Sequence, residues 1–327
     1  MTLKFISQIV KKQARSILCL GLACVAVSAS AAYPEKPIKI IVPWAPGGAT
    51  DQVGRLIAQP LSQALGVPVV VENKAGAGGV IGTQWFVKEK ADGYTVLLAT
   101  SSTNAAAPYL YTKLGFDPVN DFTPVVSLCS IPNVMVVPTK SPWNSLKDIV
   151  DASTKSPGNF TYGSAGIGGS QHLAGAQFKT TANIDIRHVP YKGSGPAAQD
   201  LVAGHIDMMI DTGSLGSIKG GLLRPIAVAS SKRLSVLPNV PTFNEAGVPM
   251  VASAWYGLVL PAGAPEDVVN RLNTEINKIL KSKEVNTRLV DMGAEVMGGT
   301  SAEFAKFTTS ELKRYEAIVK NSGAPKE

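Results

Sequence analysis

The sequence has little of what most enzymes need for catalysis. It contains three histidines, three cysteines and 6% aromatic residues among 327 positions. His172, His188 and His205 lack the spacing of metal ligands, and neither a G-x-S-x-G elbow nor a G-x-x-x-x-G-K-[ST] phosphate loop occurs. We therefore predict no metal, no cofactor and no catalytic residue. The pattern favours a binding function.

A secretory signal is indicated at the N-terminus. A basic segment comes first, followed by an apolar stretch and an A-x-A cleavage site that ends at Ala31. The apolar stretch is about a dozen residues long, well short of the ~20 that a spanning helix needs. A lipoprotein site at Cys24 fits poorly, because Gly21 stands where a branched apolar residue is usual. We predict a signal peptide over 1–31 and a periplasmic protein; its basic residues are Lys4, Lys11, Lys12 and Arg15.

Charge gives no indication of a nucleic-acid partner. The formal net charge is +7, but four of the 31 basic residues lie in the leader, which leaves 27 against 24 acidic residues. These basic residues form no cluster of the kind that binds nucleic acid. Once the leader is removed, Cys129 is the one cysteine left, so an internal disulfide is impossible and a buried thiol is expected.

Short apolar runs alternate with helical periodicity, an order that predicts an α/β fold with parallel, doubly wound sheets. We expect one helix capped by Thr50-Asp51, another capped by Ser145, and a polar loop over 100–104. About 296 residues after the leader suffice for two domains. Strands are predicted over 38–42, 67–71, 94–99, 134–137, 160–163, 186–189, 206–210, 226–229 and 255–260. Helices are predicted from about 50 to 65, then over 80–90, 145–153, 170–180, up to 203, and over 265–281, 284–292 and 302–320.

Three glycine-rich turns, over 46–48, 76–79 and 163–170, each stand between a predicted strand and a predicted helix. Helix N-termini carry free N–H groups and favour anions. The carboxyl ends of parallel strands line a crevice in open sheets. The repeated arrangement therefore predicts the capture of an anion in a cleft between two α/β units.

Nucleotide binding is the main competing interpretation. Gly76, Gly78 and Gly82 loosely match a dinucleotide fingerprint. The acidic residue expected about 20 positions later is absent, because that strand ends in Leu98-Ala99-Thr100-Ser101. An exported α/β enzyme acting on a carboxylate or a nucleotide remains the alternative to a binding protein.

Six segments, in this order, resemble the extracytoplasmic solute-binding proteins of tripartite tricarboxylate transporters, also called Bug proteins. The resemblance implies a type II periplasmic binding protein fold, with two doubly wound lobes, a two-segment hinge near 130–133 and 251–255, and a ligand cleft between the lobes. Lobe 1 would comprise 32–131 plus 254–327, and lobe 2 would comprise 132–253. The six segments are 42–51, 72–79, 164–173, 188–193, 204–207 and 241–247.

The resemblance also implies the function and the site. A monomer would capture a small carboxylate (an organic acid, a di- or tricarboxylate or an acidic amino acid) and deliver it to a membrane permease. Two positions depart from the family: Trp44 stands where Phe or Tyr is frequent, and Ala75 where proline is frequent. His172 would orient the loop rather than catalyse. The implied ligand-binding residues are Trp44, Pro46, Gly47, Gly48, Asp51, Ala77, Gly78, Gly79, Ser101, Ser102, Thr103, Asn104, Ser164, Ala165, Gly166, Gly169, Ser170, His172, Tyr191 and Asp211.

Overall fold

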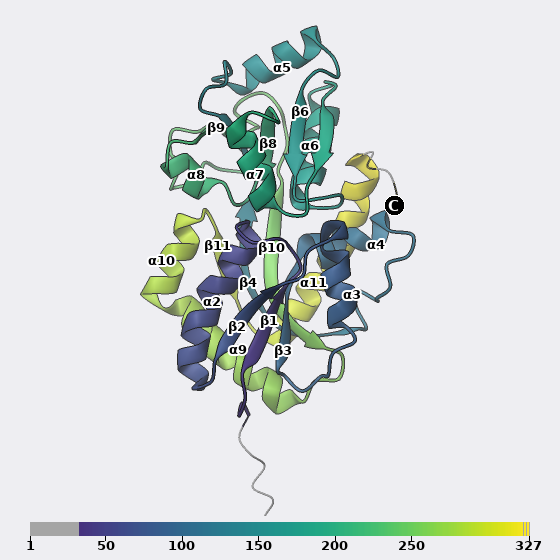
Figure 1. Ribbon diagram of the computed structural model, residues 1–327, viewed down its shortest axis with the longest axis vertical. Coiled ribbons are helices and arrows are strands. Elements are labelled where there is room, and N and C mark those ends of the chain that lie inside the picture. Colours follow the sequence, from purple (N-terminus) through teal and green to yellow (C-terminus); the bar gives the residue numbers. More distant parts are fainter. Residues whose placement is uncertain (1–32, 323, 325, 327) are drawn as a thin grey trace, which may run out of the picture. The chain divides into compact units, whose positions relative to one another are not determined.

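Two β-sheets, each covered by helices, form the framework of the protein (Figure 1). The computed structural model describes residues 33–322, 324 and 326, so the predicted signal peptide over 1–31 lies outside the described residues. From Lys36 onward the chain forms one compact unit. The first sheet has the strand order β11-β4-β10-β3-β1-β2 and the second β7-β6-β8-β5-β9. The strands are β1 (Ile38–Val42), β2 (Val69–Asn73), β3 (Thr95–Thr100), β4 (Phe122–Pro132), β5 (Val134–Pro138), β6 (Thr161–Ser164), β7 (Arg187–Pro190), β8 (Met208–Asp211), β9 (Leu223–Val228), β10 (Ser253–Pro261) and β11 (Glu295–Gly298).

Both sheets are mixed, which corrects the prediction of parallel sheets. β1 pairs in parallel with β2 and β3, whereas β10 runs antiparallel to β3 and β4. In the second sheet β6 is parallel to β7 and β8, whereas β5 is antiparallel to β8 and β9. β5 and β10 are the strands that bring the chain into a sheet from the other one. They start where their neighbours end, so they run in the opposite direction.

The helices follow the predicted order, but α4 and α8 were not predicted, α3 ends at Phe86 and not at 90, and two helix starts differ. α2 begins one residue before the predicted cap, with Gly48 at its N-cap and Asp51 in its first turn. The predicted loop over 100–104 is the end of β3 followed by a π-helical turn, η2. Ser145 caps α5 as predicted. The helical segments are α2 (Ala49–Leu65), η1 (Ala77–Gly79), α3 (Val80–Phe86), η2 (Ser102–Ala106), α4 (Ala107–Leu110), α5 (Leu146–Lys155), α6 (Ser170–Thr181), α7 (Ser194–Ala203), α8 (Leu215–Lys219), α9 (Glu266–Lys281), α10 (Lys283–Asp291) and α11 (Ser301–Ser322).

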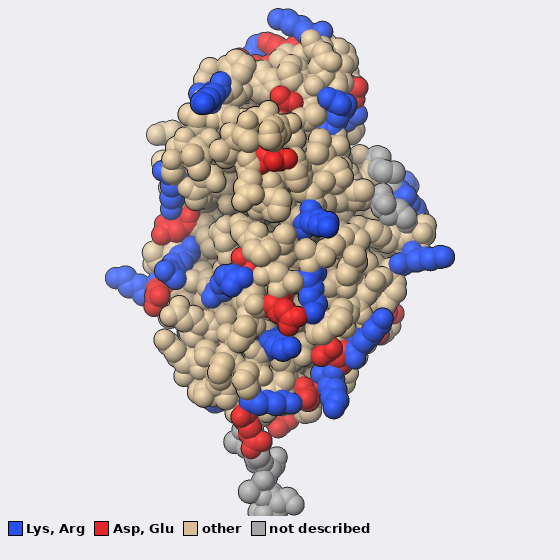
Figure 2. All heavy atoms as spheres, viewed as in Figure 1, with Lys and Arg blue, Asp and Glu red and all other residues tan. Residues whose placement is uncertain are grey.

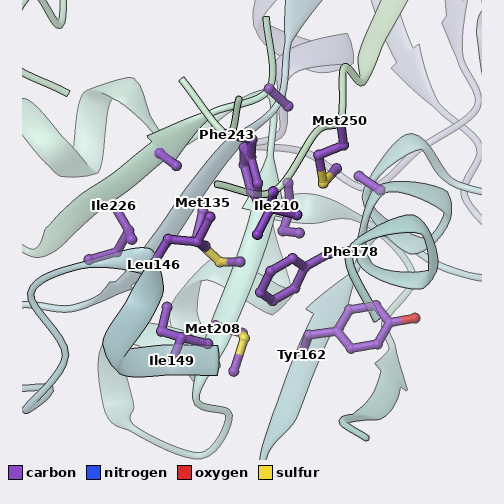
Figure 3. Close-up of a cluster of buried hydrophobic side chains, with 14 of the residues drawn as sticks. Met135, Leu146, Ile149, Tyr162, Phe178, Met208, Ile210, Ile226, Phe243 and Met250 are labelled. Atoms are coloured by element: carbon purple, nitrogen blue, oxygen red, sulfur yellow. The ribbon is translucent and has the colours of Figure 1, made fainter. Parts of the chain in front are cut away.

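Each sheet has its own apolar core. In the second, Phe178 from α6 meets Phe243 edge to face, with ring centroids 5.8 Å apart (Figure 3). Full burial of a phenylalanine side chain contributes about 1.5–3 kcal/mol. Cys129, in β4 of the first sheet, is fully buried as predicted, and burial raises the pKa of its thiol to about 12.

The chain crosses between the sheets at two adjacent segments. Asn133 is the single residue between β4 and β5, and its N–H donates to the Ala252 carbonyl at 2.9 Å just before β10. Ala252 in turn donates to Ala229, which donates to the carbonyl of Asn133, at 2.9 and 2.8 Å. This closed ring of hydrogen bonds holds the crossing segments together. The lobe boundaries at 131/132 and 253/254 stay a prediction, because the chain from Lys36 packs as one unit.

Surface charge is dispersed on the face shown in Figure 2, where Lys and Arg alternate with Asp and Glu. Within residues 33–322, no helix combines the length and the apolar character that crossing a membrane requires. Nor does this part of the chain bring together three His, Cys, Asp or Glu side chains that could hold a metal ion.

Candidate ligand-binding site

A small cavity lies where the strand ends of the two sheets meet. Its volume is about 20 Å³, which is room for about one or two water molecules. The first lobe lines it with the β1–α2 segment, the end of β3, η2 and β10, and the second lobe with the starts of α6 and α7 and the end of β8. None of the lining side chains is charged. The lining residues are Trp44, Gly48, Ala49, Thr50, Thr100, Ser102, Ala165, Ser170, Gln171, Ser194, Thr212, Ala254 and Tyr256.

Three helix N-termini converge on this cavity from both lobes. The first intrahelical bonds of α2, α6 and α7 are donated by Gln52, Leu173 and Ala197 to the N-cap oxygens, at 3.0, 3.1 and 3.5 Å. The amides of the helical residues before them therefore have no partner one turn back. Each helix start also carries the positive end of a macrodipole. The cavity wall is thus rich in N–H donors although it lacks a cation.

The glycine amides of the preceding turns are already engaged. Gly47 donates to Asp51 at 3.1 Å, and Gly166 donates to a serine hydroxyl of its own loop at 3.1 Å. Gly79 and Gly169 donate to carbonyls of their own turns at 2.9 and 3.0 Å. These glycines therefore shape the turns, while the amides without such partners belong to the first helical residues that follow.

The structure brings five of the predicted ligand-binding residues to the cavity wall: Trp44, Gly48, Ser102, Ala165 and Ser170. The other fifteen do not line it: Pro46, Gly47, Asp51, Ala77, Gly78, Gly79, Ser101, Thr103, Asn104, Ser164, Gly166, Gly169, His172, Tyr191 and Asp211. Their contact with a solute stays a prediction.

Eight lining residues were not singled out from the sequence: Ala49, Thr50, Thr100, Gln171, Ser194, Thr212, Ala254 and Tyr256. A signal for Ser194 was present, because it is the first helical residue after a glycine that follows a strand. Ser170 holds the same position at the start of α6. Tyr256 carries no such local signal, since it reaches the cavity only through the pairing of β10.

Glycines allow the two lobes to touch through their backbones. A methyl group at Gly193 would lie 2.7 Å from the Cβ atom of Ala45, and one at Gly195 would collide with the carbonyl oxygen of Pro46. The Ala45 amide also donates to the Lys192 carbonyl at 3.3 Å. The lobes are therefore in direct contact around the cavity, with no space for larger residues at these positions.

Asp51 anchors the first-lobe loop through charge. It is 5% exposed, and its carboxylate accepts from Gly47 N–H, from Asn73 at 3.0 Å and from Arg55, whose Nη2 lies 3.0 Å away. Burial by itself would raise the pKa of Asp51, but the hydrogen bonds from Arg55, Gly47 and Asn73 hold it below its ordinary value. Asn73 also donates to the Trp44 carbonyl at 3.0 Å, so this cluster fixes the loop that carries Trp44.

Asp211, in the second lobe, is anchored without a cation. It is 1% exposed, and no ion pair reaches it within the described part of the chain. One carboxylate oxygen accepts from Gln171 at 3.0 Å and from Ser194 at 2.6 Å. The other accepts from Gly213 N–H at 2.9 Å and from Ser214 at 2.6 Å. Four neutral donors therefore surround this buried carboxylate.

A column of stacked rings supports the second-lobe glycine loop. Tyr162, His188 and His172 stack with centroid separations of 4.9 and 4.1 Å. His188 Nε2 lies 2.6 Å from Ser164 Oγ, and His172 Nδ1 accepts from the Gly168 amide at 3.1 Å. Burial lowers the pKa of His172 to about 4, and burial together with the neighbouring His172 lowers that of His188 to about 3. Both rings are thus neutral supports of the loop near neutral pH.

The remaining predicted polar residues bond mainly within their own lobe. Tyr191 donates to Asp200 at 2.7 Å, and burial together with this carboxylate raises the Tyr191 pKa to about 12. Thr103 donates to Asn104 at 2.7 Å inside η2. Two serines of the set have hydroxyls without a hydrogen-bond partner among residues 33–322: Ser101, which is fully buried, and Ser102, which lines the cavity.

Comparison with known proteins finds a family and several relatives that match this chain. Residues 53–324 match the family described as the tripartite tricarboxylate transporter family receptor, TctC. Protein BugT of Bordetella pertussis is 37% identical over 296 residues, which cover 89% of this chain and 91% of BugT.

Two solved structures with bound acids are also similar to this chain. Rpa4515 of R. palustris, solved with adipate, is 35% identical with a TM-score of 0.87, covering 90% of this chain and 99% of that one. MatC of Rhodopseudomonas palustris, solved with bound malate, is 33% identical with a TM-score of 0.83, covering 88% and 100%.

Proposed function

The chain belongs to the tripartite tricarboxylate transporter receptor family, a family of solute-binding proteins, and we propose that it captures a small carboxylate between its lobes. The observation that carries this proposal is the convergence of three helix N-termini on one cavity without charged side chains. Charge-assisted hydrogen bonds contribute about 1.5–3 kcal/mol each. Three or four of them, with about 0.3–1 kcal/mol per helix start, suffice for micromolar affinity, about −8 kcal/mol. Adipate and malate in the two related structures support the same solute class.

Binding requires the lobes to part and close again. The backbones of the two lobes touch around the cavity, so the solute enters only when the lobes separate. The two crossing segments near Asn133 and Ala252 are where such a hinge motion occurs, because they join the sheets. The closed contacts of Gly193 and Gly195 then exclude water from the bound solute.

Export and delivery complete the proposal. The leader over 1–31 directs the chain to the periplasm, where the monomer presents its solute to a membrane permease. The protein acts as a carrier and not as an enzyme: its closest serine–histidine pair, Ser164 and His188, does not line the cavity, and Ser164 is fully buried.

Titration calorimetry with the purified mature chain tests the proposal. We expect stoichiometric heat with a subset of malate, succinate, citrate, adipate, glutamate and benzoate, and no product by mass spectrometry. Product formation would support the enzyme alternative, and the absence of heat with every acid would contradict carboxylate capture.

Ala49→Asp tests the position of the site. Ala49 is 3% exposed at the first helical position of α2, where a carboxylate suits the helix but fills the cavity with negative charge. Binding should be abolished, while circular dichroism remains that of the wild type. The same substitution at exposed Ala302, in the first turn of α11, is the control and should leave the affinity unchanged. An Ala49→Asp variant that binds normally would place the solute elsewhere.

A further inference from the structure

The buried carboxylate of Asp211 fixes the direction of the hydroxyl group of Ser194. A carboxylate only accepts hydrogen bonds, so the Ser194 hydroxyl, 2.6 Å away, must point its hydrogen at Asp211. A hydroxyl has one hydrogen and two lone pairs. Ser194 lines the cavity, and its hydroxyl therefore offers the cavity lone pairs alone, whereas its backbone amide belongs to the donors at the start of α7.

Ser170 is not fixed in this way. The Gln171 amide nitrogen donates to Asp211 at 3.0 Å, but its amide oxygen lies 3.4 Å from the Ser170 hydroxyl, which is longer than an ordinary O–H···O hydrogen bond. Both Ser170 and Gln171 line the cavity. The hydroxyl that is committed away from the cavity is therefore that of Ser194, and the carboxylate to which it donates has no cationic partner among the described residues.

The first lobe adds a donor side chain, whereas the donors of the second lobe are backbone amides at the starts of α6 and α7. Ser102 lines the same cavity, and within residues 33–322 its hydroxyl has no partner, so it is able to donate. Ala49 and Thr50 add the unpaired amides of the α2 start. A solute carboxylate is stabilised against this side. Against Ser194 the same carboxylate would meet lone pairs backed by a buried negative charge.

We propose that Ser194 and Asp211 form a subsite for a hydrogen-bond donor on the solute, a hydroxyl or an ammonium group carried beside its carboxylate. The inference rests on the proposed function and deepens it, because it names 2-hydroxy and 2-amino acids as the solute class. Ser194 contacts the donor. Asp211 does not line the cavity and acts as a positioning residue that orients Ser194.

Matched acids that differ in one donor group provide the test. Calorimetry compares malate with succinate, citrate with tricarballylate, lactate with propionate, and mandelate with phenylacetate; aspartate against succinate tests the ammonium group. For whichever skeleton binds, the member with the donor should bind about tenfold or more tightly, because a site built to accept a hydrogen bond discriminates against an analogue that lacks the donor.

Three variants assign the preference to residues. Ser194→Ala removes the acceptor, so it should abolish the preference: the ratio of the two affinities within a pair should fall to about one. Ser102→Ala is the matched control on the first lobe and should weaken both members of a pair by the same factor. Asp211→Asn places an amide donor beside Ser194, which frees the serine hydrogen to turn toward the cavity. The ratio of the two affinities should then fall to about one or below.

The outcomes separate this inference from the proposed function. The donor subsite would be overturned if the wild type bound both members of every pair equally, or if the preference survived in Ser194→Ala. Either result would leave carboxylate capture intact. The absence of heat with all of these acids would overturn carboxylate capture itself. If Asp211→Asn does not fold, the ratio measured with Ser194→Ala decides.

Discussion

Asp51 and Asp211 are both buried carboxylates one residue away from the cavity wall, but their surroundings differ. Asp51, in the first lobe, is neutralised by Arg55, whose side chain is 54% exposed. Asp211, in the second lobe, has four neutral donors and no ion-pair partner in the described chain. Asp51 therefore holds its loop through an ion pair, whereas Asp211 holds its neighbours through hydrogen bonds from neutral groups.

The difference shows how one site obtains two polarities. At the first lobe the carboxylate is compensated locally, so the amides of α2 remain the dominant field at the cavity. At the second lobe the uncompensated carboxylate directs the hydroxyl of Ser194 inward and leaves acceptors at the cavity wall.

Removal of each carboxylate should have the largest effect on stability, and the two lobes should differ in how much they lose. Asp211→Ala leaves four donors without an acceptor, three of them buried side chains, and should lower the free energy of unfolding by about 3 kcal/mol or more. Asp51→Ala leaves the Gly47 N–H and the Asn73 amide without this acceptor and releases a half-exposed guanidinium, and it should cost less, about 2 kcal/mol. Urea denaturation at pH 7 measures both. A larger loss for Asp51→Ala would reverse the comparison.

Acid should weaken the second-lobe loop before the first. The pKa of His172 is lowered to about 4 and that of His188 to about 3, so the unfolded chain takes up protons first as the pH falls below 6.5. The free energy of unfolding should fall by about 1.4 kcal/mol per pH unit for each histidine, about 2 kcal/mol each between pH 6.5 and 5. Asp51 keeps its contribution over this range, because its folded pKa lies below 3.8 and the contribution is lost only as the pH falls through that value.

Urea titrations across this pH range check the prediction. His172→Asn retains an acceptor for the Gly168 amide and should remove about half of the slope of stability against pH. An unchanged slope in His172→Asn would mean that the buried column does not govern acid stability.

Local sequence signals account for most of the fold and for part of the site. Apolar runs and glycine turns predicted the strand–helix order, and Ser145 was identified as a cap from its position alone. β4 was missed because Phe122–Pro132 contains two prolines and no clear alternation. The mixed sheets were missed because strand direction depends on long-range pairing, such as that of β10 with β3 and β4.

The site shows the same division. Gly48 and Ser170 were found because each belongs to a glycine turn that precedes a helix. Thr212 and Tyr256 could not be found, because their hydroxyls meet at 3.2 Å only after the two sheets are joined. The role of Asp211 could not be predicted from the sequence either, because it depends on which neighbouring groups donate hydrogen bonds to the carboxylate.

Blocking the contact between the lobes should have an intermediate effect. A methyl group at Gly195 would collide with the Pro46 carbonyl, so Gly195→Ala should hold the lobes apart and weaken solute binding by about tenfold, or 1.4 kcal/mol. Gly216→Ala, where an added Cβ has nothing within 4 Å, is the matched control and should bind normally. Small-angle scattering with solute should show that Gly195→Ala stays more extended than the wild type. If it closes to the same dimensions, the glycine contact is not required.

The smallest effect is expected at the tryptophans. Trp44 and Trp255 are both buried, and within the described residues neither indole N–H has a partner, so a change to phenylalanine breaks no hydrogen bond. Trp44 lines the cavity, whereas Trp255 packs against Phe304 and Phe307 at 6.0 and 5.6 Å. Trp44→Phe should change the affinity by about threefold or less, well under 1.4 kcal/mol, yet abolish the fluorescence change on solute binding. Trp255→Phe should retain that change, because its ring lies in the first-lobe core and away from the closing surfaces. The opposite result is a fluorescence change that persists in Trp44→Phe and disappears in Trp255→Phe. It would show that closure alters the core more than the cavity wall, and it would contradict the movement of two rigid lobes about the crossing segments.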